Sequence, residues 1–347
     1  MKHLREGLFL AALVVGLWPQ AAAAQLPFPF SLNLGGFASR CRTDAEIPPE
    51  PRAAFEASAL DFARAVAAQR PERAYSNFIP EVRQKMSGEQ FEKSVISMLN
   101  GLLPVGELRV AHSYFVERTS LGTGADASMI CTQEANGSVD KPEGRVTVVV
   151  KSISEQAHVA IEGENPIGKF VFTLWLFNQD GKWAVAGFWL NAANAVGKGP
   201  EEYWTLARAE KEKGRNFTAY IFYVTALQIA NRGPTFKLGI EPEIRKELDG
   251  VPVPPELAGK PPFVWPGARG EHRVLQVGPG EVEGKFGLRI VQQIAAWNDD
   301  KEAEDSNRAL LAPFVKAHPE LIELFPRIGV RAVTADRKRF FTTIASP

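Results

Sequence analysis

The 347-residue chain has little cysteine, little histidine and no excess of either charge. It contains two cysteines and five histidines, and its 40 Lys and Arg residues balance 40 Asp and Glu residues. Without a net positive charge, the chain has no electrostatic basis for binding nucleic acid. With 45% hydrophobic and 23% charged residues, the composition is that of a folded globular protein of about two domains.

Signature motifs of common enzymes are missing as well. The histidines beyond the N-terminal segment, His112, His158, His272 and His318, are far apart in the sequence, so no helix carries a zinc-binding His pair. The hydrolase motif Gly-x-Ser-x-Gly does not occur. Residues 278–280, Gly-Pro-Gly, resemble part of a phosphate-binding loop without its Lys-Ser/Thr ending, and we expect a turn between strands there. We therefore expect no metal and no cofactor.

The N-terminus has the three parts of a secretory signal peptide. A positively charged start is followed by an apolar run over residues 8–18 and by four alanines at 21–24. The apolar run has about 11 residues, whereas a membrane-spanning helix needs ~20. We expect residues 1–24 to be cleaved on export, which leaves a secreted or periplasmic protein without a membrane anchor.

Both cysteines, Cys41 and Cys131, lie in the exported part of the chain. In an oxidising compartment a lone pair of cysteines is expected to form a disulfide, although two unpaired thiols are the alternative. The bond would close a loop of roughly 90 residues and stabilise the fold by about 4 kcal/mol. It would attach the irregular N-terminal arm, residues 25–49, to the first domain.

The hydrophobic period is first helical and then changes to that of strands. Residues 51–66 and 72–78 favour helices, and Ser87 with Gln90 forms a capping box before a third helix that ends at Gly101. Period-two segments follow, separated by Gly, Asn, Asp and Pro. The predicted strands are 108–117, 127–134, 145–152, 157–162, 170–177 and 183–190.

The last two predicted strands form the strongest local signal. Asp180-Gly181 supplies the positive φ angles of a hairpin turn between them. Residues 170–177 and 183–190 are apolar on both faces, so we expect the hairpin to be covered on two sides. The N-terminal helices are one expected cover, and the C-terminal half or a second subunit in a homodimer is the other.

Helices followed by a bent antiparallel sheet that ends in a Trp-bearing hairpin resemble the nuclear transport factor two-like superfamily, which includes steroid isomerases and polyketide cyclases. The closest likeness is to its secreted bacterial branch of unknown function. The residues that carry it are 67–75, 78–87, Phe91, Gly106 and 181–188, within residues 50–192. The resemblance implies an α+β domain over 50–198, with helices packed on a curved, cone-like antiparallel sheet. These are packing motifs, so they indicate fold rather than activity.

The C-terminal half has three predicted parts. Residues 200–233 are similar to a single tetratricopeptide-type helical hairpin, which we place at 199–240. Residues 241–270 are rich in Pro and Gly and favour an ordered linker or a domain boundary. Residues 271–347 are expected to form a small α+β module.

Candidate site residues come from the predicted sheet. Enzymes of the superfamily transfer protons with a carboxylate or His base in an apolar pocket. The catalytic candidates are His158, Tyr114 and Asp126, with His112, Glu134 and Glu162 as further titratable residues on strands. For His158 and Tyr114 a structural role in the core is the alternative. The candidate binding residues are the hairpin aromatics Phe172, Trp175, Trp183 and Trp189.

Two functions fit these patterns. The first is an exported, non-enzymatic protein that binds a small apolar ligand, a peptide or another envelope protein. The second is an isomerase- or cyclase-like enzyme, which rests on the superfamily resemblance alone. A cone interior filled by its own aromatic side chains would exclude both the enzyme and a small-ligand site inside the cone.

Overall fold

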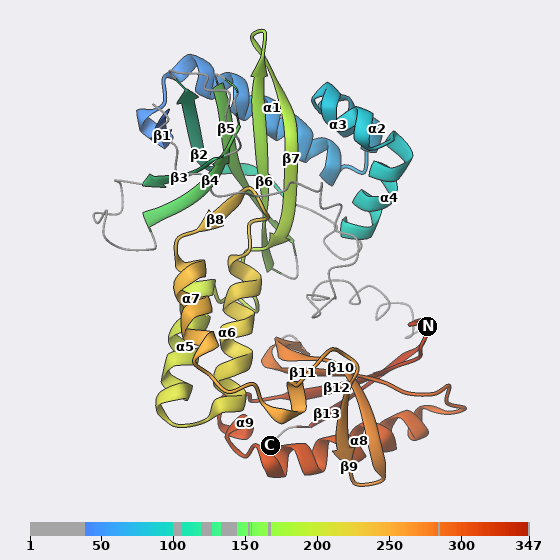
Figure 1. The fold of residues 1–347 in the computed structure, drawn as a ribbon. Helices are drawn as coiled ribbons and strands as arrows, with labels where there is room; N and C mark the ends of the chain where they lie inside the picture. Colours follow the sequence, from blue (N-terminus) through green and yellow to red (C-terminus); the bar gives the residue numbers. More distant parts are fainter. Residues whose placement is uncertain are drawn as a thin grey trace. The chain divides into compact units, whose positions relative to one another are not determined.

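The computed structural model divides the chain into two compact units of α+β structure, which confirms the predicted fold class (Figure 1). The first unit contains residues 39–193 and 230–243, and the second contains 194–229 and 244–345. The described residues are 39–99, 106–118, 127–132, 144–151, 153, 155–165, 168–283 and 285–345. The predicted signal peptide, most of the predicted arm, Asp126 and Glu134 lie outside them.

Four helices begin the first unit. The predicted ones are α1 (Pro49–Ala67), α2 (Pro71–Ser76) and α4 (Gly88–Leu99). The capping box before α4 is confirmed, because Ser87 and Gln90 exchange backbone-to-side-chain hydrogen bonds of 2.9 and 3.2 Å. The fourth helix, α3 (Pro80–Lys85), was not expected. Pro80 indicated the end of the preceding helix, but it occupies the first position of α3, where a missing N–H costs nothing.

The main sheet of the first unit has five strands in the order β1-β2-β5-β6-β7, all antiparallel. Their bounds are β1 (Ser39–Thr43), β2 (Arg109–Arg118), β5 (Glu155–Asn165), β6 (Gly168–Gln179) and β7 (Lys182–Ala192). The hairpin turn between β6 and β7 is confirmed, because Asp180 and Gly181 have φ angles of +54° and +84°.

A second, three-stranded sheet belongs to the same unit. It consists of β3 (Ala127–Thr132), β4 (Arg145–Val150) and β8 (Phe236–Leu238). The predicted disulfide is confirmed: Cys41 in β1 is bonded to Cys131 in β3, with Cα atoms 5.7 Å apart. The bond therefore links the edges of the two sheets.

The β6–β7 hairpin is covered on two sides over most of its length, as predicted for its apolar sequence. Residues 170–177 are all buried. On one side Trp183 packs against Phe55 of α1, with ring centroids 5.3 Å apart. On the other side Phe236 of β8 lies 6.2 Å from His158, the partner of Trp175 in the sheet. The expectation that the C-terminal half supplies the second cover is therefore correct in part, because β8 comes from that half, whereas β3 and β4 of the same three-stranded sheet come from the first half.

The second unit contains the predicted helical hairpin, α5 (Pro200–Glu212) and α6 (Asn216–Ala230), and a third helix, α7 (Ile240–Asp249). Glu247 of α7 joins the three helices. Its carboxylate accepts hydrogen bonds from Trp204 Nε1 at 3.0 Å and Tyr223 Oη at 2.9 Å, and it forms an ion pair with Arg208.

The sheet of the second unit has the order β13-β12-β11-β10-β9. Its elements are β9 (Phe263–Gly267), β10 (Gly270–Val282), β11 (Lys285–Gln293), β12 (Ile328–Val333) and β13 (Phe340–Ala345), with α8 (Asp300–Ala317) and α9 (Glu320–Leu324) after β11. Asn307 of α8 bonds to Gln292 and Thr343, so α8 covers the face of the sheet to which these side chains point.

One expectation for the second half was correct only in part, and another was wrong. Residues 241–270 contain most of α7 and the whole of β9 instead of a continuous linker, although a boundary between the two units falls among them, between Glu243 and Ile244. Proline is compatible with both, because Pro242 lies in the first turn of α7 and Pro266 in an edge strand. Residues 278–280 form no turn but lie inside β10, paired with β11, and the chain reverses between Val282 and Lys285.

Candidate functional site

Aromatic side chains fill the space between the helices and the main sheet of the first unit. Phe62 lies 5.2 Å from Phe78 and 5.1 Å from Phe188, and Phe78 lies 5.1 Å from Phe91. Of the predicted binding residues, Phe172, Trp175 and Trp183 belong to this core. The interior that would form the pocket of a cone-shaped enzyme is therefore occupied by the protein itself.

The two described catalytic candidates, His158 and Tyr114, are enclosed on the other face of the sheet. His158 is fully buried, stacks on Trp175 with ring centroids 5.6 Å apart, and donates from Nε2 to the Val149 carbonyl at 3.1 Å. Burial lowers its pKa to about 3. Tyr114 is 2% exposed, its ring lies 5.2 Å from Phe236, and burial raises its pKa. Neither side chain is placed to contact a substrate, so their alternative role in the core fits better.

A pocket of about 260 Å³ opens at the edge of the main sheet, beside Trp175. We call it the Trp175 pocket. Its apolar wall comes from β6, β7, α3 with the residue before it, and the segment after β4. The apolar lining residues are Ile79, Val82, Ile153, Trp175, Phe177 and Ala186.

Local structure explains how α3 and Ala186 reach this place. The chain before α3 pairs with β7, because Ile79 N donates to the Val185 carbonyl at 3.0 Å and Val185 N donates to the Asn77 carbonyl at 2.9 Å. The pairing of β6 with β7 contains a bulge at Ala186, because Leu176 pairs with Val185 whereas Trp175 pairs with Gly187. Such a bulge redirects a side chain, and Ala186 is the additional residue that lines the pocket.

Charged and polar side chains complete the pocket lining: Glu81 and Lys85 of α3, Lys151, and Gln179 of β6. The lining therefore carries two positive charges and one negative charge. Glu81 and Lys85 form no ion pair in the part of the chain that the structure describes. The pocket lining thus combines an apolar wall with two lysines and one glutamate, and of the two lysines Lys151 also has an interaction partner of its own.

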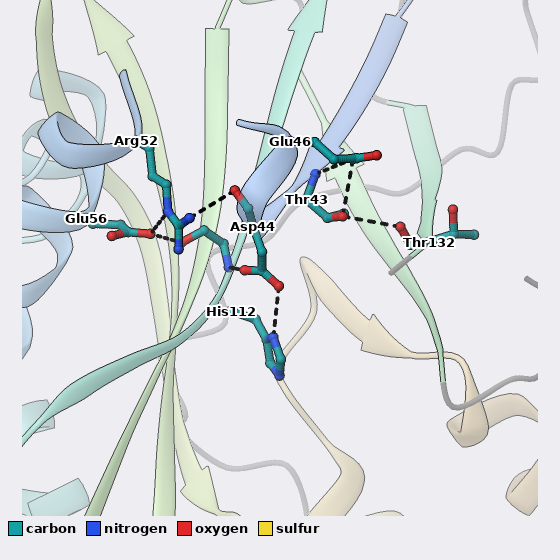
Figure 2. A network of polar contacts seen from close by, with 8 residues as sticks. Thr43, Asp44, Glu46, Arg52, Glu56, His112 and Thr132 are labelled. Carbon is teal, nitrogen blue, oxygen red and sulfur yellow. Dashed lines mark hydrogen bonds and ion pairs between the residues drawn. The ribbon is translucent and has the colours of Figure 1, made fainter. Parts of the chain in front are cut away.

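A separate polar network surrounds Asp44, at the junction of β1, β2 and α1 (Figure 2). Asp44 accepts hydrogen bonds from Ser113 N at 2.8 Å and from His112 Nδ1 at 3.2 Å. Arg52 donates to the Asp44 carbonyl at 3.1 Å and to Glu56 at 2.7 Å, and Glu56 also accepts from Ser113 Oγ at 2.7 Å. These bonds fix the start of the described chain to β2 and α1.

The network shifts the pKa values of its two central groups in opposite directions. The hydrogen bond to Asp44 raises the pKa of His112, although partial burial opposes this. The hydrogen bond from His112, with that from Ser113, keeps the pKa of Asp44 low, although burial acts the other way. Ser113 and His112 are consecutive in β2 and point to opposite faces, and the Ser113 hydroxyl bonds to Glu56. The three residues therefore do not form a nucleophilic triad.

The remaining candidates are scattered. Glu162 forms an ion pair with Arg109 at 3.0 Å. Trp189 is half-buried beside Gly233, where a Cβ atom would lie 2.8 Å from its side chain. Among the predicted site residues that the structure describes, only Trp175 lines the pocket. The residues that sequence reasoning missed come mainly from α3, whose signal was a proline followed by the amphipathic sequence Glu-Val-Arg-Gln-Lys.

Comparisons with family models, curated proteins and solved structures found no match to this chain. Within the described ranges, no helix has the length and apolar character needed to cross a membrane. The same residues contain no group of three or more His, Cys, Asp or Glu side chains arranged to hold a metal ion.

Proposed function

We propose that this chain is an exported, non-enzymatic binding protein whose Trp175 pocket receives a small apolar molecule with one anionic end. The observation that carries the proposal is the pocket itself, with Trp175 and Phe177 on its wall and Lys85 and Lys151 in its lining. Ligand sites are typically concave and mostly apolar, with a few polar groups that orient the ligand.

The size of the pocket limits the ligand. An apolar cavity of about 150 Å³ accommodates benzene, so 260 Å³ has room for two fused rings or a chain of about ten carbons. The net charge of the lining matches a single carboxylate. A medium-chain fatty acid or an aromatic carboxylic acid has both properties.

Several observations support binding rather than catalysis. The interior is filled, and the enclosed His158 and Tyr114 lie away from the pocket lining. Glu81 is the one carboxylate of that lining, and it forms no hydrogen bond with a second polar group among the described residues. Proton transfer in an apolar site needs a base held by such a partner. The isomerase or cyclase alternative therefore has no base held by a second polar group in the described pocket lining.

Export and the superfamily assignment are parts of the same proposal. The Cys41–Cys131 disulfide fits an oxidising compartment. Four helices followed by four strands of a five-stranded antiparallel sheet, whose edge strand β1 precedes the helices, support the assignment to the nuclear transport factor two-like superfamily. Mass spectrometry of the protein recovered from the periplasm or medium tests the export, and we expect the chain to begin at Gln25. Recovery in the cytoplasm with an intact N-terminus would contradict it.

Isothermal titration with three matched probes tests the binding. We expect decanoate to bind more tightly than decanol, and decylamine to bind most weakly, because the lining is net positive. In Lys85→Glu the lining becomes net negative, and the preference should reverse towards decylamine. Lys93→Glu is the control, since Lys93 is an exposed cation on α4 outside the pocket. Absence of binding of all three probes, or equal binding of decanoate to Lys85→Glu and the control, would overturn the proposal.

A further inference from the structure

One buried side chain of the first unit contacts three residues of the Trp175 pocket without lining the pocket itself. Gln156 of β5 is fully buried, and it bonds to Trp175, Lys151 and Ile153, which all line the pocket. In the pairing of β5 with β6, Gln156 is directly opposite Phe177. Its side chain therefore lies on the same face of the sheet as those of Phe177 and Trp175.

The amide of Gln156 binds the main chain of Lys151 as a neighbouring strand would. Lys151 N donates to Gln156 Oε1 at 3.0 Å, and Gln156 Nε2 donates to the Lys151 carbonyl at 2.8 Å. A longer contact of 3.5 Å joins Nε2 to the Ile153 carbonyl. Because β4 ends at Val150, these bonds attach the segment that follows the strand to β5.

The same amide oxygen accepts the indole N–H of Trp175. The distance from Trp175 Nε1 to Gln156 Oε1 is 3.3 Å. The indole also stacks on His158, with ring centroids 5.6 Å apart, and meets the edge of Phe177 at 4.9 Å. The ring contacts and the hydrogen bond together fix the orientation of Trp175, which is 2% exposed.

These contacts use the complete hydrogen-bonding capacity of the Gln156 side chain. A glutamine amide accepts two hydrogen bonds and donates two. Oε1 accepts from Lys151 N and Trp175 Nε1, and Nε2 donates to the carbonyls of Lys151 and Ile153. The pocket wall at Trp175 therefore offers apolar ring surface to a ligand, while the indole donor and the acceptor behind it are bonded to each other.

We propose that Gln156 determines the specificity of the Trp175 pocket, which selects an unsubstituted hydrocarbon group over one that carries a hydroxyl group. This inference rests on the proposed binding function. A ligand hydroxyl placed against this wall gives up its hydrogen bonds to water and gains none from the amide or the indole. Gln156 is a positioning residue, because it acts through Trp175 and the segment after β4.

Isothermal titration with decanoate and two hydroxydecanoates tests the selectivity. One hydroxydecanoate carries its hydroxyl group in the middle of the chain and the other at the end. We expect the wild type to bind at least one of them about tenfold more weakly than decanoate, because a buried hydroxyl group without a partner is costly. Equal affinity for all three probes would overturn the inference and leave the proposed function intact, whereas absence of all binding would overturn both.

Two variants separate this selectivity from the lower hydrophobicity of the hydroxylated probes. Trp175→Phe keeps an aromatic wall but removes the indole N–H, so Gln156 Oε1 regains an acceptor position for the ligand hydroxyl. We expect the discrimination to fall to about threefold or less. Gln156→Met removes the acceptor and leaves the indole N–H to the ligand, which should lower the discrimination as well. Wild-type discrimination in Trp175→Phe would overturn the inference, even if Gln156→Met fails to fold.

Thr173→Val is the matched control. Thr173 lies two residues before Trp175 on the same face of β6 and is 3% exposed, and its hydroxyl has no hydrogen-bond partner within the described ranges. Its loss should change neither affinity nor discrimination. A purely structural role of Gln156 would weaken the binding of all three probes by the same factor in Gln156→Met, and this result would contradict the inference.

NMR of the wild type tests the central hydrogen bond without any ligand. The indole N–H resonance of Trp175 can be identified by its absence in Trp175→Phe. We expect this proton to exchange slowly with solvent, because Gln156 Oε1 accepts it. Rapid exchange would show that the bond does not persist in solution and would overturn the inference.

Discussion

The two five-stranded sheets of this chain differ in what covers them. In the first unit, residues 170–177 of β6 are all buried, between helices on one side and a three-stranded sheet on the other. In the second unit, α8 covers one face, and the other face has half-buried arginines. A sheet buried on both sides has no wide polar face, so its candidate site lies at its edge, beside Trp175. The sheet of the second unit carries arginines on the face opposite to α8.

Substitutions on opposite faces of one strand test this difference with the largest effects. We expect Leu174→Ala and Trp175→Ala, neighbours in β6, each to lower the free energy of unfolding by about 3–5 kcal/mol, because both leave cavities in packed surroundings. In β11, Ile290→Ala should cost about 2–4 kcal/mol and Val291→Ala about 1 kcal/mol or less. Urea denaturation measures the free energy of unfolding of all four variants. If Trp175→Ala costs no more than Val291→Ala, the second cover of β6 is not a packed layer.

Removal of the disulfide should affect one unit only. The Cys41–Cys131 bond lies within the first unit, and its loss in the Cys41→Ser, Cys131→Ser double variant should cost about 2–5 kcal/mol. Hydrogen exchange followed by mass spectrometry separates the units. We expect faster exchange in β1, β2 and β3 and unchanged exchange in β10 to β12. Equal acceleration in both would show that the units do not unfold separately.

Glu247 offers the matching test for the second unit. Glu247 accepts hydrogen bonds from Arg208, Trp204 and Tyr223. We therefore expect Glu247→Gln to lower the free energy of unfolding by about 1–3 kcal/mol at pH 7. The Arg208 hydrogen bond lowers the pKa of Glu247, although burial opposes it. Stability from this group is therefore present above the unfolded pKa, near 4.3, and is lost as the pH falls through the folded pKa. The difference between wild type and Glu247→Gln should shrink below pH 4, and a constant difference would contradict this role.

The smallest expected effect is at His112. Because its pKa is raised by the hydrogen bond to Asp44, the stabilisation is present below the unfolded pKa of about 6.5 and is lost as the pH rises through the folded pKa. The side chains are 48% and 35% exposed, so solvent screening limits the effect to about 0.5 kcal/mol. A histidine titration followed by NMR should give a higher pKa for His112 in wild type than in Asp44→Asn. Equal values would show that the contact in Figure 2 does not persist in solution.

The strands and most helices were predictable because their signals are local. The period-two segments, the Asp180-Gly181 turn and the Ser87–Gln90 capping box act over a few residues, and each has its predicted structure. The apolar sequence of β6 predicted that both of its faces are covered, but it did not predict which element covers the second face. Phe236 of β8 is nearly 80 residues after His158 in the sequence, and no local pattern links them.

The candidate sites were less predictable for the same reason. Trp175 was a predicted binding residue, but its partners in the pocket come from α3, whose Pro80 indicated the end of a helix. Gln156 lies between two predicted strands, and it meets Trp175 only through the pairing of β5 with β6. The glycines of residues 278–280 were noticed as a loop motif, whereas they lie in β10, where a Cβ atom at Gly280 would contact the Arg289 side chain at 3.4 Å.

A crystal structure of the full chain grown with decanoate tests the proposed function most directly. We predict electron density for the chain of the ligand along Trp175 and Phe177, with its carboxylate near Lys85 or Lys151. Decanoate between α1 and the main sheet, with the aromatic core displaced, or a Trp175 pocket that remains empty at saturating decanoate, would contradict it.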